Sequence, residues 1–485
     1  MFLTFTTHCN RAASVLPISR LCAVNIRQQS TRIDSKKVPP RVLIHSIKGK
    51  KPNFTSLQDA ISLIKSDCDI FVHPFGATPT ELLQELCRQV SSGRLTDVRL
   101  SHVLHQGDVP WAKPECIGKV RSNCLFIHNS TRQLVKEGKA DYTPAFLSDL
   151  PRLYINHIIP VDYALVQVSP PDNHGFCSLG CSVDCTFAVC QVADHIIALV
   201  NEQMPRTFGD TVIHSSQFDA MVEVNRPIIG KPDSTMKADE DEEKIGKFIA
   251  DNLIDDGATL QMGIGALPDS CWAAMKNHKN LGVHTELLSD GVIDLVKENV
   301  ISNACKTIDN GKIVTSLAFG TKEFYEFLDN NPVIEFRSCG YTNNPSIIRQ
   351  QHKMTSINTV IEMDLTGQST AESIGASFYS GFGGQLDFAY GAGVTDDGEG
   401  KSIIAMTSTT RNGQSKIVPY LKEGAGVVVT RGHVRYVVTE YGVAQLFGRS
   451  VRHRAYELIH IAHPQFRESL EKAAFERLKC MPSRD

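Results

Sequence analysis

Hydrophobic residues come in short continuous runs along this chain, and several runs end at a turn that contains glycine. Ala258–Met262 is an apolar run of strand length, and Gly263–Pro268 (GIGALP) follows it with two glycines and a proline typical of a helix start. A second strand is predicted at Leu281–Thr285, just before Glu286. Ligands of open α/β sheets bind outside the carboxyl ends of strands, so we expect this turn and the Glu286 carboxylate to face one ligand.

The same pattern occurs twice. Phe71–Leu86 (FVHPFGATPTELLQEL) and Leu260–Met275 (LQMGIGALPDSCWAAM) both end a strand with Gly-Ala-x-Pro and start a helix. Between them, Arg226–Lys247 interrupts the apolar rhythm with two prolines and a run of acidic residues, which we expect to open a helix. The repeated pattern suggests two related halves, and we interpret Arg226–Lys247 as the boundary between domains at residues 40–229 and 240–485.

The length and composition of the chain agree with a globular protein of two domains. With 485 residues the chain is too long for one typical core, and 42% hydrophobic with 21% charged residues is ordinary for a globular protein. The net charge of −3 provides no basic field for nucleic acid, and no apolar run approaches the roughly 20 residues that span a bilayer. We therefore expect small-molecule substrates and no nucleic acid or membrane partner; a homo-oligomer remains open.

The first 35 residues have a different composition. Four arginines but no acidic residue precede Asp34. This composition is typical of a mitochondrial transit peptide, so the mature protein is predicted in the mitochondrial matrix. A disordered basic tail is the alternative, whereas a secretory signal is disfavoured because charges interrupt the apolar residues.

Other polar clusters give weaker signals. The 14 cysteines include three spaced every four residues, which predicts one helical face of buried thiols rather than a zinc site, and no metal is expected: Cys177, Cys181, Cys185. His284 lies two residues before Glu286, so it is predicted on the same sheet face. The basic run Arg449–Arg454 could meet phosphates, although a solvated helix face is favoured.

A second glycine cluster changes the interpretation. Ser380–Phe388 reads SGFGGQLDF, which is too rich in glycine for an ordinary loop. Together with three further segments it looks like the acetyl-CoA hydrolase/transferase family. Those segments are Ser169–Asp184 (SPPDNHGFCSLGCSVD), His284–Gly291 (HTELLSDG) and Thr439–Ser450 (TEYGVAQLFGRS).

This resemblance implies a fold of two similar open α/β domains of the CoA-transferase type, with the active site between them. It implies that Glu286 attacks an acyl-CoA thioester and becomes an acyl-glutamyl anhydride and then a glutamyl-CoA thioester. Asn343 and the Gly384 amide match the oxyanion donors, with the neighbouring Asn344 as the alternative. The residues matched to coenzyme contacts are Gly263, Ile264, Gly265, Ala266, Leu267, Gly381, Gly383, Gly384 and Lys401.

The resemblance thus implies transfer of coenzyme A from acetyl-CoA or propionyl-CoA to succinate, with coenzyme A as substrate and no tightly bound cofactor. Hydrolysis of acetyl-CoA and 4-hydroxybutyrate CoA transfer are alternatives that use the same glutamate. A dinucleotide-binding oxidoreductase is the rival from another class, because Glu286 follows Gly265 by 21 positions as a ribose-binding acid would. Pro268 argues against it, since that fingerprint needs a small residue there. A regulator that binds coenzyme A without turnover also remains possible.

Overall fold

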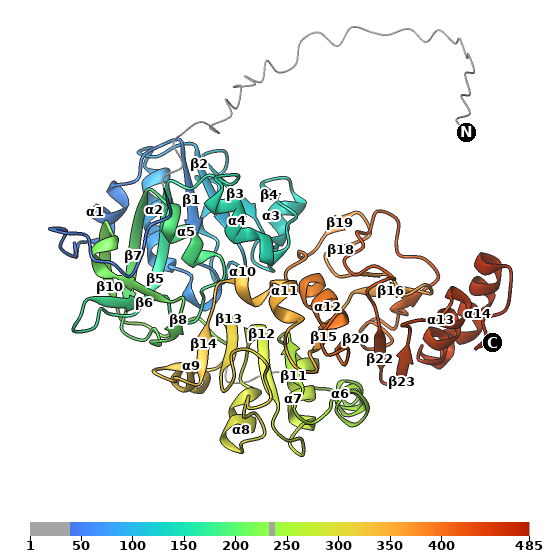
Figure 1. Cartoon of the computed structure of the whole chain (residues 1–485). Helices are drawn as coiled ribbons and strands as arrows, with labels where there is room; N and C mark the ends of the chain where they lie inside the picture. Colours follow the sequence, from blue (N-terminus) through green and yellow to red (C-terminus); the bar gives the residue numbers. More distant parts are fainter. Residues whose placement is uncertain (1–38, 232–237, 485) are drawn as a thin grey trace, which may run out of the picture. The chain divides into compact units, whose positions relative to one another are not determined.

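The first half of the chain forms a seven-stranded sheet in the order β10-β7-β5-β1-β2-β3-β4, drawn in blue and green in Figure 1. All its strands are parallel. Along β1 (Cys68–Val72), Ile70 and Val72 pack under helices α1 and α2, whereas Phe71 packs on the opposite face near α4 and α5. Both faces are buried, as is usual for parallel sheets.

The other elements of this half are as follows: α1 Leu57–Ser62, α2 Thr80–Ser91, β2 Val98–His102, β3 Val120–Cys124, α3 Arg132–Lys136, β4 Ala140–Tyr142, α4 Leu150–Ile155, β5 Tyr163–Val168, β6 Phe176–Ser178, α5 Thr186–Val192, β7 His195–Asn201, β8 Phe208–Gly209, β9 Val212–His214 and β10 Ala220–Val224, with short 3₁₀ turns η1 Phe75–Ala77, η2 Pro110–Ala112, η3 Leu147–Asp149 and η4 Ser215–Gln217.

The second half forms a nine-stranded sheet in the order β23-β22-β20-β15-β11-β12-β13-β14-β8. Its outermost strand β8 comes from the first half, and β23 is antiparallel to its neighbour β22. Removing these two edge strands leaves an order that repeats the first sheet, with β11 in the place of β1 and β12 in the place of β2. The fold is therefore the predicted pair of similar open α/β units.

The elements of this second half are as follows: α6 Glu240–Leu253, β11 Thr259–Met262, α7 Ala266–Ala274, β12 Gly282–Leu288, α8 Val292–Lys297, β13 Ile313–Ala318, α9 Lys322–Leu328, β14 Ile334–Phe336, α10 Cys339–Thr342, α11 Pro345–Ile348, β15 Thr355–Thr359, β16 Glu362–Asp364, β17 Ser369–Thr370, β18 Ser373–Ile374, β19 Ser377–Phe378, α12 Gln385–Gly393, β20 Lys401–Ala405, β21 Ile417–Val418, β22 Tyr436–Thr439, β23 Gly442–Gln445, α13 Val451–His460 and α14 Pro464–Leu478.

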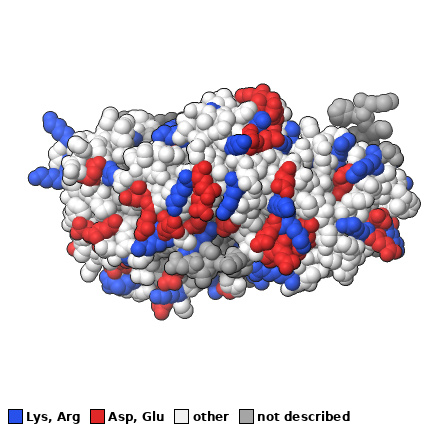
Figure 2. All heavy atoms as spheres, turned by 90° about the horizontal axis from the view of Figure 1, so that it is seen from below, with Lys and Arg blue, Asp and Glu red and all other residues white. Residues whose placement is uncertain are grey.

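The computed structural model describes residues 39–231 and 238–484. The predicted transit peptide, and the part of the predicted domain boundary at 232–237, lie outside the described residues. Residues 40–485 form one unit, in which one apolar core runs from Leu43 through both halves to Val438. No helix among the described residues is long and apolar enough to cross a membrane. Figure 2 shows acidic and basic side chains interspersed over one face of the molecule.

Two local predictions from the sequence, the acidic helix start and the helical face of cysteines, had different outcomes. The acidic run opens α6 as predicted, because Asp239 accepts the Asp241 and Glu242 amides while the Glu242 side chain binds back to the Asp239 amide. The predicted helical face of cysteines is wrong. Cys177 lies in β6, Cys181 in a turn and Cys185 at the start of α5, because the segment folds back on itself.

Candidate active site

Glu286 lies inside strand β12, not just past its end as the sequence suggested. The strand extends to Leu288 because Leu287 and Leu288 continue the pairing with β13. At Glu286 itself the ladder is interrupted, and its carbonyl oxygen accepts the side-chain hydroxyls of Thr315 and Ser316 at 3.2 Å each. The backbone at the candidate nucleophile is therefore held by side chains.

Two donors meet the Glu286 carboxylate. Asn343, the residue after α10, is completely buried, and its Nδ2 donates to Oε2 at 2.9 Å. The backbone amide of Gly384, at the start of α12, also donates to this carboxylate. A Cβ at Gly384 would overlap both the Asn343 amide nitrogen and Glu286 Oε2. Only glycine fits where the backbone comes this close.

The surroundings of this carboxyl bring its pKa close to neutral pH. The pKa of Glu286 is raised to about 7, mainly by burial and in small part by the nearby Asp184 carboxylate, although the hydrogen bonds from Asn343 and Gly384 act in the lowering direction. The side chain stays half-buried, so a ligand can still reach it. A carboxylate with weakened solvation and two aimed donors suits a nucleophile whose reaction passes through tetrahedral oxyanions.

The structure separates the two neighbouring asparagines. Asn344 caps α11, with its Oδ1 accepting the Ser346 amide at 2.9 Å. Its side chain is therefore used within the backbone turn, whereas Asn343 faces the glutamate. The predicted position Asn343 is the one that the fold brings to Glu286.

The glycine loop is held by the first half of the chain. Ser380 and Gly383 carbonyl oxygens accept the Ile127 and Leu147 amides at 3.3 and 3.0 Å. A Cβ at Gly381 would lie 2.9 Å from the Phe126 ring, so this loop and the aromatic side chain are in close contact. The candidate site therefore lies between the two halves, as the resemblance implied. Phe126 itself gave no signal in the sequence.

Two buried acids near the site were also not anticipated as site residues. Asp387, in the first turn of α12, accepts the Ser148 hydroxyl at 2.9 Å and the Ser148 amide at 3.3 Å, and burial raises its pKa to about 7. Asp184 is completely buried and accepts the Ser182 hydroxyl at 2.9 Å. Both residues lie within motifs of the resemblance, but their burial beside Glu286 depends on contacts between distant segments.

The predicted coenzyme-binding turn lies at the carboxyl end of β11, beside β12. Gly265 has φ +128°, in the region that favours glycine, and precedes α7, whereas a Cβ at Gly263 would meet open space. Ile264 packs against the buried cluster of Phe75, Leu317 and Phe319. Leu267 points into the core, and Ala266 opens α7. The turn itself, rather than the start of the helix, is thus placed to meet a ligand.

Lys401 is not brought to Glu286. Strand pairing sets it level with Val283, three strands and three residues away from the glutamate, or roughly 17 Å. Its Nζ already forms an ion pair with Asp255 at 2.5 Å. A contact between Lys401 and the coenzyme stays a prediction.

His284 supports the site from within the sheet. Its Nε2 donates to the Thr342 carbonyl at 2.8 Å, and its Nδ1 accepts the Gln351 amide at 3.2 Å. Burial lowers the pKa of this imidazole to about 3, so the ring is neutral at physiological pH. It therefore holds the chain next to Asn343 and has no free nitrogen for proton transfer.

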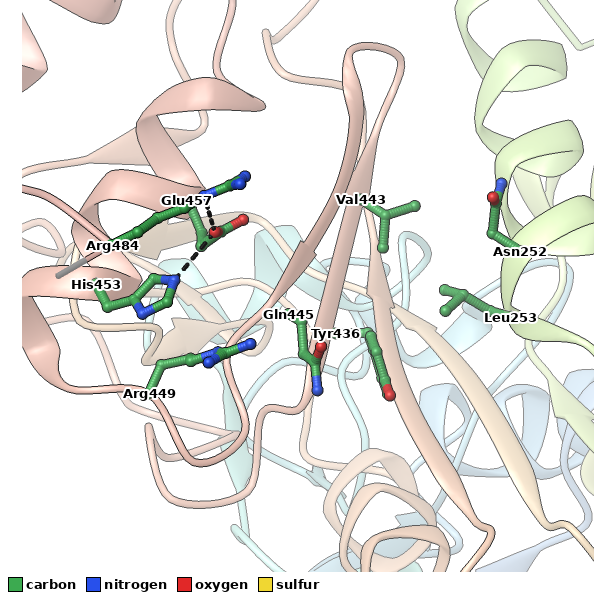
Figure 3. A pocket seen from close by; sticks show the side chains of 9 residues that line it. All are labelled: Asn252, Leu253, Tyr436, Val443, Gln445, Arg449, His453, Glu457 and Arg484. Carbon is green, nitrogen blue, oxygen red and sulfur yellow. Dashed lines mark hydrogen bonds and ion pairs between the residues drawn. The ribbon is translucent and has the colours of Figure 1, made fainter.

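The basic run Arg449–Arg454 starts at a separate pocket of about 550 Å³, shown in Figure 3. This pocket lies between α6, strand β23 and the start of α13. Glu457 accepts both His453 and Arg484 there at 3.1 Å each, as the dashed lines show. None of its lining residues belongs to the Glu286 site, so the run is not a part of that site.

Comparisons with known proteins agree with this geometry. The N-terminal domain model of the acetyl-CoA hydrolase/transferase family matches residues 49–230, and the C-terminal domain model matches residues 320–474. The chain is 47% identical to a succinyl-CoA:acetate/propanoyl-CoA:succinate CoA transferase of Fasciola hepatica, over 98% of both chains. It is 44% identical to a 4-hydroxybutyrate coenzyme A transferase of Clostridium kluyveri, over 87% of this chain and 96% of that protein.

Solved structures are similar as well. RipA from Yersinia pestis superimposes with a TM-score of 0.83 at 34% identity, covering 88% of this chain and 98% of RipA. A 4-hydroxybutyrate CoA-transferase from Porphyromonas gingivalis gives a TM-score of 0.75 at 37% identity, with the same coverage. With two family domains, a relative of this identity along nearly its whole length and the Glu286 site between two like sheets, the chain belongs to the acetyl-CoA hydrolase/transferase family.

Proposed function

We propose that this protein is a CoA-transferase that moves coenzyme A from acetyl-CoA or propionyl-CoA to succinate through a covalent glutamyl-CoA thioester on Glu286. The observation that carries the mechanism is the pair of donors, Asn343 and the Gly384 amide, on a half-buried carboxylate at the meeting point of the two sheets. The choice of acids is supported by the Fasciola hepatica relative, whose name describes succinyl-CoA:acetate and propanoyl-CoA:succinate exchange.

The reaction proceeds by balanced exchanges. The Glu286 carboxylate attacks the thioester carbonyl of the acyl-CoA, expelling the coenzyme A thiolate and leaving an acyl-glutamyl anhydride. The thiolate then attacks the glutamyl carbonyl, which releases the free carboxylate and leaves glutamyl-CoA. Succinate repeats both steps in reverse, so succinyl-CoA leaves and Glu286 is an ionised carboxylate again. No water is consumed and the thioester energy is kept.

Each exchange passes through a tetrahedral oxyanion. Asn343 Nδ2 and the Gly384 amide already point at the Glu286 carboxylate, so they are aimed at the oxygen that becomes the oxyanion when the thiolate attacks the glutamyl carbonyl. Such donors contribute about 3 kcal/mol each. The turn Gly263–Gly265 is placed to contact the coenzyme, which acts as a substrate, and no tightly bound cofactor is required.

Trapping tests this proposal directly. Incubation with acetyl-CoA alone, without an acceptor, should leave the enzyme as glutamyl-CoA, which hydroxylamine or borohydride then converts at one side chain. Activity should be lost only when acetyl-CoA precedes the reagent, and succinate should protect. Mass spectrometry should find the change in the tryptic peptide Asn280–Lys297; an unmodified peptide in protein that is turning over acyl-CoA would rule out the covalent mechanism.

Hydrolysis and 4-hydroxybutyrate transfer are the alternatives to be tested with the same enzyme. The Clostridium kluyveri relative supports the second of these. Rates of acetyl-CoA consumption are compared with no acceptor, succinate, propionate and 4-hydroxybutyrate. A rate that is independent of the acceptor would establish a hydrolase instead.

We also propose that the protein works in the mitochondrial matrix, on the strength of the acid-free, arginine-containing residues 1–35. These residues fused to a fluorescent protein should direct it to mitochondria, and the enzyme without residues 2–33 should stay active but remain outside them. A reporter that stays in the cytosol would exclude this localisation.

A further inference from the structure

Beyond the residues that touch the glutamate, one buried hydroxyl contacts the Asn343 amide. Thr342 is completely buried at the end of α10, and its Oγ1 donates to Asn343 Oδ1 at 2.9 Å. The other end of the same amide donates to Glu286 at 2.9 Å. The Asn343 side chain is therefore held at both ends, by a hydroxyl behind it and by the carboxylate in front.

The hydroxyl is itself fixed. Thr342 Oγ1, whose proton goes to Asn343, lies 3.1 Å from Ser316 Oγ, and the single Ser316 proton is available either to Thr342 Oγ1 or to the Glu286 carbonyl oxygen 3.2 Å away. Below it, His284 Nε2 donates to the Thr342 carbonyl at 2.8 Å, and the neutral ring is locked by Gln351. Strands β12 and β13 thus anchor both the backbone and the hydroxyl of Thr342.

We propose that Thr342 is a positioning residue, whose hydroxyl holds the Asn343 amide with its N–H group toward Glu286 throughout the exchange. This inference rests on the proposed function. While Glu286 is ionised, its negative charge by itself is sufficient to keep the Asn343 N–H group directed toward the carboxylate. Once Glu286 is acylated, that charge is gone, and the Thr342 hydroxyl is the contact that keeps the amide from turning between one oxyanion and the next.

The main test replaces Thr342 by valine, which has the same shape but no hydroxyl. The buried Asn343 Oδ1 then has no donor, so we expect kcat to fall about tenfold while KM for acyl-CoA changes little. Thr342→Ser keeps the hydroxyl and should restore most of the rate. A weaker Asn343 hydrogen bond also raises the pKa of Glu286, so the rise of kcat/KM with pH should move to higher pH in Thr342→Val.

A matched control is available in β11. Thr259 is also completely buried, and its hydroxyl has no hydrogen-bond partner among the described residues. Thr259→Val should leave kcat and the pH profile unchanged. If Thr342→Val does not fold, Thr342→Ala gives the same readouts with less steric demand.

Three outcomes would overturn the inference: kcat of Thr342→Val within twofold of the wild type, a pH profile that does not move, or Thr342→Ser as slow as Thr342→Val. A merely structural role would lower the melting temperature and the active fraction without moving the pH profile. If hydroxylamine labels Glu286 normally in the wild type while Thr342→Val is fully active, only this inference fails. If the wild type is never labelled, the proposed function fails first.

Discussion

The two halves of the chain can be compared residue by residue, because their sheets have the same order. The turns after β1 and β11 share Gly-Ala-x-Pro, which matches Phe71 with Leu260. Phe71 pairs with Ser101 on β2, and Leu260 pairs with Val283 on β12. Ser101 and Val283 are therefore equivalent, and so are the residues that follow them. Each is followed by a buried histidine whose pKa burial lowers to about 3.

Three positions after this matched pair, the halves differ. The second half has Glu286, and the first half has Leu104. Leu104 packs in an apolar cluster with Phe75 and Leu317, whereas Glu286 meets the two donors. The same register position lies two residues past the end of β2 in the first half and inside β12 in the second, and it carries a packing side chain in one and the candidate nucleophile in the other. The topology places both positions at the carboxyl ends of parallel strands. The residue type and its hydrogen-bond donors then determine whether the position can bind or react with a ligand.

The largest effect is expected at this position itself. Glu286→Gln removes the nucleophile but keeps the size and polarity of the side chain, so transfer should fall below detection in a folded protein that still binds coenzyme A. Adding Leu104→Glu should not restore transfer, because Asn343 and the Gly384 amide face residue 286, whereas Leu104 packs in an apolar cluster. Acetyl-CoA:succinate exchange is the measurement. Recovered activity in the double variant would mean that the two positions are functionally interchangeable.

The donors should come next. Gly384→Ala places a methyl group where the Asn343 amide and the Glu286 carboxylate now lie, so kcat should fall by about 10²-fold or more. Gly432→Ala is the matched control, since its Cβ would make only an ordinary contact of 3.7 Å with Thr430. Steady-state rates and melting temperatures of both variants separate catalysis from folding. Normal turnover in folded Gly384→Ala would remove this amide from the site.

The two turns offer a smaller test. Gly263 is matched by Pro74 in the first half, so the fold itself does not require glycine at this position. A Cβ at Gly263 would meet open space, and Gly263→Ala should fold with nearly unchanged stability. If the turn contacts coenzyme A, KM for acyl-CoA should rise about tenfold, because the backbone can no longer approach the ligand closely. An unchanged KM would place the coenzyme elsewhere.

The smallest effect concerns pH and stability. Because the pKa of Glu286 is raised to about 7, kcat/KM should rise with pH and level off above pH 7 as the nucleophile ionises.

The folded protein holds this proton more tightly than the unfolded chain, so stability falls as pH rises from 4.5 to 7. Glu286→Gln lacks this term and should be the more stable protein at pH 8, with the difference shrinking by pH 5. Denaturant unfolding at both pH values measures this difference, which includes the part of the raised Asp387 pKa that the Glu286 charge causes and that has the same sign. A constant difference would contradict the raised pKa.

Local sequence determined the elements around the site: the strand, glycine turn and helix at Thr259–Ala274, the acid-opened helix α6 and the strand that leads to Glu286. These features follow from neighbouring residues, through periodicity, turn chemistry and capping. Asn343 and Gly384 were named through family resemblance, since neither spacing nor composition connects them with Glu286.

The tertiary structure alone decided which of these groups meet. Asn343 lies 57 residues beyond Glu286, and the glycine loop is fixed by amides near residues 127 and 147, so no local pattern encodes their contact. Strand pairing likewise placed Lys401 far from the glutamate and extended β12 past it. The raised pKa of Glu286 depends on burial, and burial arises only when distant segments of the chain pack together and exclude water. The support from Thr342 depends on the same packing. Neither can be inferred from neighbouring residues in the sequence.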